Sequence, residues 1–232
     1  MNKVLYIVVI YGIRREESPA WQGVHTLLGD ADLYVHDNTG ENIYLAKAYN
    51  KGLQYAKEKG YSWLVLLDAD TQVTEQYLQA VQQTVETQEP ESAYCPVLLG
   101  ENGQQLSPKK VYGIPVAFNS GLLLPVAVTD RLGGFNEAYP LDYLDHWTCH
   151  QLQQRHIALR TLPVQLTHTL SLQTYAHMPA WRYASLLEAE KRFAQETDNT
   201  RTYRCRLFGR WLKWALTGHP YARETYQAWR NL

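Results

Sequence analysis

The chain has 232 residues, of which 45% are hydrophobic and 19% are charged, so it is long enough to bury a substantial core. Lys and Arg together number 22 and Asp and Glu 23, and the net charge of −1 excludes the overall basicity typical of nucleic-acid-binding proteins. The cysteines Cys95, Cys149 and Cys205 are widely spaced with no C-x-x-C pair, which argues against a disulfide framework or zinc knuckle and favours a reducing compartment.

Short β-branched runs alternate with amphipathic helical segments in the N-terminal part of the chain. The predicted strands are residues 4–10, 33–36, 63–68 and 93–99. The predicted helices between them are residues 45–59 and 74–87. This alternation is typical of parallel strands joined by crossover helices, so the sequence predicts an α/β nucleotide-binding fold with a mostly parallel central sheet.

The first apolar run, residues 4–10, is short, lacks a small-residue cleavage site and leads into Arg14 and Arg15, so we interpret it as a buried strand and not as a signal peptide. No other apolar run approaches the roughly 20 residues that a membrane-spanning helix needs. We therefore expect a cytoplasmic protein.

The middle of the chain is predicted to complete the same domain. The expected elements are a loop or hairpin at 100–115, a strand at 119–125, a turn at 133–137, a helix at 142–154 and a closing strand pair at 157–162 and 165–168. We expect residues 1–177 to form this domain and residues 178–232 to form a helical extension.

The predicted C-terminal extension is basic and aromatic. Within residues 200–232 the basic residues are Arg201, Arg204, Arg206, Arg210, Lys213, Arg223 and Arg230, against the single acid Glu224, with Trp211, Trp214 and Trp229 interleaved. A helix that lies peripherally on an anionic membrane has this composition. A helical cap whose aromatic residues pack on the core, with Arg stems reaching outward, would have it as well, and both interpretations stay open.

Two carboxylates, Asp68 and Asp70, stand at the end of the apolar run 63–67, with Ala69 between them. The period of a strand sends both to one side, and Mg²⁺ or Mn²⁺ favours carboxylate oxygens together with substrate phosphates. An isolated pair of this kind is also common as a turn cap. In open parallel sheets ligands bind beyond the carboxyl ends of the strands, where Tyr11, Asp37 and Asn38 fall too.

Further segments occur in a recognisable order. They are Tyr11 after the first strand; Val35-His36-Asp37-Asn38-Thr39; Glu41-Asn42 through Ala46, Ala48, Asn50 and Gly52, similar to an N-x-G-x-A-x-x-x-N-x-G stretch; Leu66-Leu67-Asp68-Ala69-Asp70; Asn119-Ser120-Gly121-Leu122-Leu123; Gly133-Gly134-Phe135-Asn136-Glu137; Asp142-Tyr143-Leu144-Asp145; and Leu166-Thr167-His168. Over residues 3–175 the chain resembles the family 2 glycosyltransferases of the GT-A fold, closest to the rhamnosyltransferase-like members.

The resemblance implies a nucleotide-sugar donor and a Mn²⁺ or Mg²⁺ ion. Asp37 would accept a hydrogen bond from the imide nitrogen of uracil or thymine, and Asp68 would hold the ribose hydroxyls or, through water, the metal. Asp70 would bind the metal that bridges the diphosphate, with His168 as a further ligand. The resemblance assigns the remaining donor-side positions to Tyr11, Asn38, Asn50 and Ala69.

The resemblance also implies a catalytic base and an acceptor side. Asp145 would take the proton of the acceptor hydroxyl, and Asp142, one helical turn earlier, would compete for this role or cap the helix. Two acids at a helix N-terminus are also expected for structural reasons alone. The acceptor-side residues would be Ser120, Gly121, Phe135 and Trp147.

Three departures from the family pattern bear on these roles. His146-Trp147 follows Asp145 where relatives carry an acid and then an Arg, and Trp147 is a candidate to stack on an acceptor sugar instead. Gly12 stands where Asn is common, and Thr39-Gly40 replaces Gly-Ser. We therefore expect a nucleotide-contacting loop of different shape.

The predicted function is inverting transfer of a sugar from dTDP-rhamnose or a UDP-hexose to a glycan or lipid-linked acceptor in bacterial cell-surface polysaccharide synthesis. The alternatives are a catalytically degenerate sugar-nucleotide-binding protein and, with less support, a nucleotidyltransferase. The latter would need a Gly-rich phosphate loop after the first strand, which residues 11–15 do not supply. The sequence does not set the acceptor, the linkage or the oligomeric state.

Overall fold

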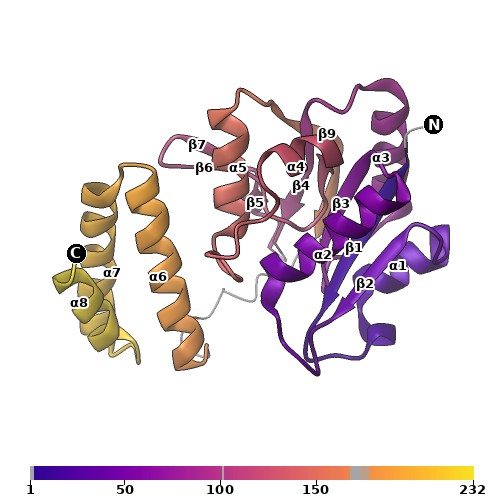
Figure 1. Cartoon of the computed structure of the whole chain (residues 1–232). Coiled ribbons are helices and arrows are strands. Elements are labelled where there is room, and N and C mark those ends of the chain that lie inside the picture. Colours follow the sequence, from indigo (N-terminus) through magenta and orange to yellow (C-terminus); the bar gives the residue numbers. More distant parts are fainter. Residues whose placement is uncertain (1–2, 101, 168–174, 176–177) are drawn as a thin grey trace. The chain divides into compact units, whose positions relative to one another are not determined.

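The computed structural model describes residues 3–100, 102–167, 175 and 178–232 (Figure 1). The chain divides into two compact units, Met1–Thr169 and Leu170–Leu232, and each is described here by itself.

The first unit is built on a seven-stranded sheet with the order β2-β1-β3-β8-β4-β5, and β9 also pairs with β4. The strands are β1 (Val4–Ile10), β2 (Leu33–Asp37), β3 (Trp63–Asp68), β4 (Ala93–Leu99), β5 (Gln105–Ser107), β8 (Leu122–Pro125) and β9 (Leu159–Thr167). Only β8 and β5 run antiparallel to their neighbours in this described sheet. The prediction of a mostly parallel α/β sheet is confirmed.

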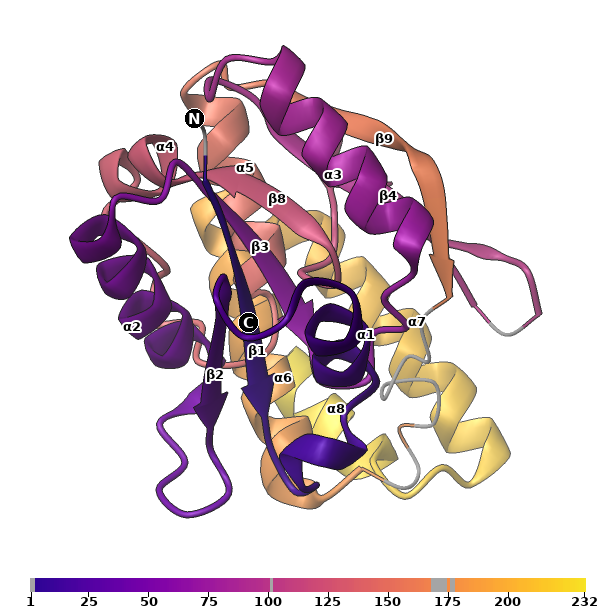
Figure 2. The same ribbon diagram turned by 90° about the vertical axis from the view of Figure 1, so that its right-hand side faces the viewer.

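Helices cover both faces of this sheet. They are α1 (Pro19–Leu28), α2 (Tyr44–Lys59), α3 (Glu75–Thr87), α4 (Val126–Arg131) and α5 (Leu144–Gln154), with the short 3-10 helix η1 (Arg15–Glu17) before α1. Figure 2 shows α1 and α3 in front of the sheet and α5 behind it. Every residue of β1 and all of Trp63–Leu67 in β3 are buried between these layers, which explains their unbroken apolar sequence.

One glycine leaves room for a core side chain between α2 and the sheet. A Cβ atom on Gly52 would lie 2.6 Å from Cδ1 of Ile7 in β1. A side chain at this position would require the Ile7 side chain to shift. Gly52 therefore allows α2 to pack closely on Ile7 of β1.

The predicted strand at 119–125 begins later than expected, at Leu122. Gly121 has a φ of +89°, a left-handed conformation that breaks the strand, and its N–H donates to the carbonyl of Leu66 at 2.8 Å. The chain thus turns sharply beside the carboxyl end of β3 before β8 starts.

The segment after the glycine-rich turn also differs from the prediction. Tyr143, with φ of +65°, is the N-cap of α5, and Asp142 lies outside the helix. The expectations that the helix begins at Asp142 and that Asp142 lies one helical turn before Asp145 were wrong, because the left-handed Tyr143 starts the helix two residues later. The predicted closing strand pair is the single strand β9, which pairs with β4 through a register shift near Cys95. The loop at 100–115 contains β5 and the separate hairpin of β6 (Lys109–Val111) and β7 (Ile114–Val116).

The second unit consists of α6 (Ala180–Glu196), α7 (Thr200–Thr217) and α8 (Ala222–Arg230). Tyr183 is buried between the rings of Trp214, 5.6 Å away, and Tyr221, 4.6 Å away. Arg210 forms two hydrogen bonds with the buried Glu190, at 2.7 and 2.9 Å. No helix in the described part of the chain is long and apolar enough to cross a bilayer.

Candidate functional site

The carboxyl ends of the three parallel strands meet at one edge of the sheet. In the register of the sheet, Ile10 of β1 lies beside Asp37 of β2, and Val9 lies beside Asp68 of β3. Tyr11, which follows β1, is 58% exposed at this edge. The prediction that Tyr11, Asp37 and Asp68 fall together beyond the strand ends agrees with this register.

Asp68 is held by a serine that we assigned from sequence to the acceptor side. The hydroxyl of the buried Ser120 donates to Oδ2 of Asp68 at 2.5 Å. This contact exists because β8 pairs with β3, so the turn at Gly121 places Ser120 next to the strand end. Ser120 therefore orients Asp68, a carboxylate that we predicted from the sequence to lie on the donor side. Asp70, two residues on, is exposed.

The loop between the two carboxylates is fixed by the start of α1. The carbonyl of Ala69 accepts hydrogen bonds from the Ser18 hydroxyl at 2.7 Å and from the Ala20 N–H at 3.3 Å. Ser18 is fully buried and caps α1 by accepting from the Trp21 N–H. Neither α1 nor Ser18 was predicted from the sequence, although a serine before proline is a typical helix start.

Asp37 and Asn38 behave differently from each other. Asp37 is exposed, and its hydrogen bonds with Thr39 lower the pKa of the carboxyl, so Asp37 stays charged as an acceptor. Asn38 is only 3% exposed, and its side-chain oxygen accepts from the Ile43 N–H at 3.2 Å. Its side chain shapes the loop that leads into α2.

Helix α2 begins with a strained residue. Tyr44 has φ of +64° and stands where the motif that the chain resembles has glycine. The Asn42 side chain accepts from the Tyr44 N–H, and the carbonyl of Pro140 accepts from the N–H groups of Leu45 and Ala46. These contacts hold the exposed Tyr44 ring against a cleft of about 340 Å³. Its lining residues are Glu41, Asn42, Ile43, Tyr44, Ala46, Lys47, Glu137 and Pro140.

Asn50 ties α2 to the loop that precedes Asp142. Its side-chain oxygen accepts from the Phe135 N–H at 2.8 Å, and its amide group donates to the Phe135 carbonyl at 2.9 Å and to Glu137 at 3.2 Å. Gly134 allows this approach, since a Cβ there would lie 2.6 Å from the Asn50 oxygen. Phe135 is buried against Tyr49, with ring centroids 5.3 Å apart. Both predicted site residues therefore position the loop through internal contacts.

Asp145 lies at the start of α5 beside a histidine. Its Oδ1 accepts from the backbone N–H of His146 at 2.8 Å and contacts Nδ1 of the same residue at 2.6 Å. Burial raises the pKa of Asp145, but the charge and hydrogen bonds of His146 and the charge of Lys109 outweigh it and leave the pKa below its ordinary value. Asp145 is therefore ionised at neutral pH. Lys109 comes from β6, and nothing local in the sequence links it to Asp145.

The phenol of Tyr49, in α2, is fully buried. Burial raises its pKa well above the ordinary value, and the charges of Asp68, Asp145 and Asp70 raise it further. Tyr49 therefore stays a neutral phenol at neutral pH.

Two further predicted residues are buried. Trp147 is 9% exposed and Asp142 is 8% exposed. Burial leaves little of the Trp147 ring for the predicted stacking on an acceptor sugar. Asp142 is also set apart from the helical face of Asp145 by the turn at Tyr143.

The described residues supply only part of the predicted metal site. Among the described residues there is no group of three or more His, Cys, Asp or Glu side chains arranged to hold a metal ion. His168, the predicted third ligand, lies outside the described residues. Asp68 and Asp70 offer the oxygen donors that a hard cation uses together with phosphate oxygens, so the residues present fit Mn²⁺ or Mg²⁺ bound jointly with a diphosphate.

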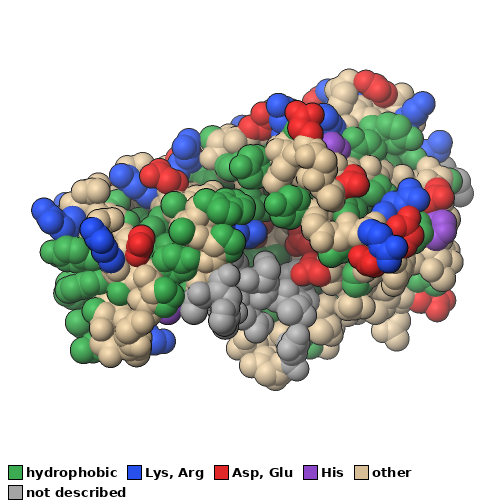
Figure 3. All heavy atoms as spheres, turned by 90° about the horizontal axis from the view of Figure 1, so that it is seen from below, with side chains coloured by type: hydrophobic (Ala, Val, Ile, Leu, Met, Phe, Trp, Pro, Cys, Tyr) green, Lys and Arg blue, Asp and Glu red, His purple; other side chains and the backbone are tan. Residues whose placement is uncertain are grey.

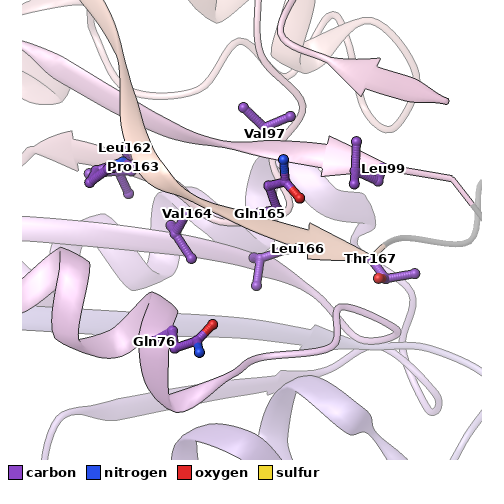
Figure 4. Close-up of a pocket in the computed structure, with 9 residues that line it drawn as sticks. All are labelled: Gln76, Val97, Leu99, Leu162, Pro163, Val164, Gln165, Leu166 and Thr167. Carbon is purple, nitrogen blue, oxygen red and sulfur yellow. The ribbon is translucent and has the colours of Figure 1, made fainter. Parts of the chain in front are cut away.

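A larger cavity of about 740 Å³ lies between β4, β9 and the start of α3 (Figure 4). It is lined by Gln76, Val97, Leu99, Leu162, Pro163, Val164, Gln165, Leu166 and Thr167. None of these side chains is charged, so the cavity does not suit a diphosphate with its metal ion. Its chemistry differs from that of the carboxyl edge of the sheet with Asp37, Asp68 and Asp70, which we call the acidic edge.

Residues 29–124 match the family model for glycosyl transferase family 2. This segment contains β2, α2, β3 and the turn at Ser120, which together supply most of the acidic edge. A comparison with curated proteins found no significant match.

Comparison with solved structures found related folds. The chain is similar to GalNAc-T7 with UDP, GalNAc and Mn²⁺ at a TM-score of 0.52 and 12% identity, covering 94% of this chain and 58% of that one. It is similar to the mannosyltransferase PcManGT from Pyrobaculum calidifontis in complex with GDP-Man and Mn²⁺ at 0.54 and 16%, covering 99% and 82%. It is also similar to the catalytic domain of Drosophila β1,4-galactosyltransferase 7 with xylobiose at 0.50 and 16%, covering 79% and 73%.

Proposed function

We propose that this chain, which carries the GT-A fold of the family 2 glycosyltransferases, is an inverting glycosyltransferase that uses a nucleoside diphosphate sugar. The observation that carries the proposal is that Asp37 and Asp68 end the two strands on either side of β1 at the carboxyl edge of the sheet, with Asp70 two residues on, inside the segment that matches the family model. A transferase of this kind needs carboxylates for the donor's diphosphate and a separate carboxylate for the acceptor's proton.

On the donor side, the exposed and charged Asp37 would accept a hydrogen bond from the imide N–H of uracil or thymine. Asp68, oriented by Ser120, would hold the ribose or a metal-bound water, and Asp70 would hold the metal ion, with His168 as a proposed further ligand. Bound Mn²⁺ or Mg²⁺ would neutralise the charge on the leaving nucleoside diphosphate. The proposed donors are dTDP-rhamnose and a UDP-hexose.

On the acceptor side, Asp145 would be the general base. Both hydrogen bonds from His146 reach Oδ1, so we assign Oδ2 to accept the proton of the acceptor hydroxyl. The hydroxyl oxygen would then form a bond to the anomeric carbon as the bond from that carbon to the diphosphate oxygen breaks. His146 would keep the carboxylate oriented and ionised.

The proposed acceptor is a glycan or a lipid-linked glycan in bacterial cell-surface polysaccharide synthesis, and the proposed location is the cytoplasmic side of the membrane. The basic and aromatic C-terminal helices support a peripheral position there. A sugar-nucleotide-binding protein without turnover is the second candidate, favoured by His146-Trp147 in place of the acid and Arg expected after the base.

The test compares Asp145→Asn with the wild type and with Glu91→Gln, an exposed acid in the loop before β4. Asp145→Asn should lower kcat by about 10²- to 10⁴-fold, the usual contribution of a general base, without changing the dissociation constant of the donor. Because the pKa of Asp145 is below its ordinary value, its base form persists, and kcat/KM should stay level from about pH 7 to about pH 5.

Two outcomes would contradict the proposal. An unchanged rate in Asp145→Asn would remove Asp145 as the base. Donor binding with no turnover in the wild type, across glycan and lipid-linked acceptors, would favour the binding protein. Glu91→Gln should have the same kcat and the same donor dissociation constant as the wild type.

A further inference from the structure

The outward side of helix α7 carries large apolar residues that the core of its unit does not use. Phe208, Leu212 and Leu216 follow one another at a spacing of four residues and are 39%, 45% and 80% exposed. The spacing places them along one side of the helix. Tyr203, Leu207 and Trp214 are buried on the opposite side. We call the residues Arg201, Arg204, Phe208, Leu212 and Leu216 the outer face of α7.

The charge on α7 is of one sign. The helix contains five basic residues and no acid: Arg201, Arg204, Arg206, Arg210 and Lys213. Arg210 is committed to the buried Glu190, whereas the other four are exposed. Arg204 and Arg201 lie one and two turns before Phe208 on the outer face, and Lys213 flanks it. The exposed apolar line is therefore bordered by positive charge.

Aromatic rings of intermediate exposure continue this surface onto α8. Phe208 packs on Trp211 at 5.3 Å and on Trp229 at 5.2 Å, and the Arg204 guanidinium lies over the Trp229 ring at 5.6 Å. Figure 3 shows hydrophobic side chains interspersed with Lys and Arg over the C-terminal helices. Tryptophan beside arginine is favoured at the boundary between lipid headgroups and acyl chains.

We propose that the outer face of α7 is a docking surface for an anionic lipid bilayer. The apolar line would enter the boundary of headgroups and acyl chains, while the flanking cations would bind anionic headgroups. A second copy of this chain fits less well, because two such faces would bring like charges together. This inference deepens the proposed location but does not depend on sugar transfer, so it can fail or hold separately.

The test is co-sedimentation of the full chain with vesicles of phosphatidylcholine alone or with about a third phosphatidylglycerol. Binding should require phosphatidylglycerol and weaken with salt. Each flanking cation removed should lower the partition coefficient about fivefold, so the double variant Arg201→Gln/Lys213→Gln should lose roughly 25-fold. Leu212→Ser/Leu216→Ser should abolish detectable binding.

Matched controls separate the surface from general effects. Leu27→Ser/Leu28→Ser changes two exposed leucines of α1, and Lys51→Gln/Lys59→Gln changes two exposed lysines of α2. Both should bind anionic vesicles like the wild type. Far-UV circular dichroism of each α7 variant should match that of the wild type, because the substituted residues are exposed.

Three results would overturn the inference. The wild type could fail to bind anionic vesicles, or the α7 variants could bind them like the wild type. Alternatively, sedimentation without lipid could show a dimer that Leu212→Ser/Leu216→Ser dissociates, which would assign the face to a second copy. A loss of turnover in Asp145→Asn with vesicle binding intact would leave this inference standing.

Discussion

Tyr44 combines an unfavourable backbone conformation with an exposed ring at the border of a cleft. A non-glycine residue in the left-handed region costs on the order of 1–2 kcal/mol. The hydrogen bonds to Asn42 and Pro140 hold this conformation in place. Backbone strain at the border of a cleft indicates that the Tyr44 ring serves contacts in the cleft and does not stabilise the fold.

We expect Tyr44→Gly to leave the free energy of unfolding unchanged or to raise it by up to about 1 kcal/mol, because relief of strain offsets the greater freedom of glycine in the unfolded chain. The matched control is Lys47→Gly, at an exposed and ordinary helical position of α2, which should lose about 0.5–1 kcal/mol. Urea unfolding of both variants measures the difference. Equal destabilisation by the two substitutions would show that Tyr44 is not strained.

The positions of acidic residues at the strand ends could be predicted from the sequence, while the residues that hold them in place could not. Asp37 and Asp68 could be predicted because the residue pattern of a strand and the point where the strand ends depend on neighbouring residues in the sequence. Ser120 contacts Asp68 from 52 positions away, and Ser18 contacts Ala69 from 51 positions away. These contacts depend on tertiary packing that exists only in the folded protein. Asn50 matched a motif, but its partner Phe135 lies 85 positions away.

Among the elements, the helices of the second unit depend on one buried ion pair. Glu190 in α6 is 5% exposed, and its two bonds to Arg210 link α6 to α7. Arg210 also lies over the rings of Tyr175 and Trp214. A buried carboxylate without its partner is costly, so this pair sets how α7 seats against α6.

We expect Arg210→Met to lower the free energy of unfolding by about 3–5 kcal/mol, because Glu190 would remain charged and buried without its partner. The matched control, Arg201→Met on the exposed side of the same helix, should change it by less than about 0.5 kcal/mol. Adding Glu190→Leu to Arg210→Met should recover most of the loss. Tryptophan fluorescence during urea unfolding measures all three, and equal stabilities of the two single variants would contradict this account.

Helices and strands could be predicted from the sequence where a local hydrophobic pattern determines them. The apolar runs of β1, β3 and β4 and the amphipathic pattern of α2 and α3 gave these elements to within a residue at either end. The start of α5 was missed because Tyr143 adopts a left-handed conformation that no local pattern requires. The fusion of two expected strands into β9 depends on pairing with β4, which is a tertiary contact.

At the scale of the whole molecule, the chain joins a unit with an acidic edge to a unit with a basic, apolar helix face. The acidic edge belongs to Met1–Thr169 and the outer face of α7 belongs to Leu170–Leu232. The two features suit different ligands, a metal-bound diphosphate and an anionic surface. A protein that transfers sugar to a lipid-linked acceptor would use both.

The measurement that tests the central claim most directly is a thermal-shift panel of UDP, dTDP, GDP and CDP, each with and without Mn²⁺. A ligand that binds the folded state raises its apparent stability. We predict a Mn²⁺-dependent rise with UDP or dTDP in the wild type, and its loss in Asp70→Ala and His168→Ala. Glu91→Gln should behave as the wild type. The absence of a shift with every nucleotide, or a shift that persists in Asp70→Ala, would contradict the assignment of the acidic edge as a donor site.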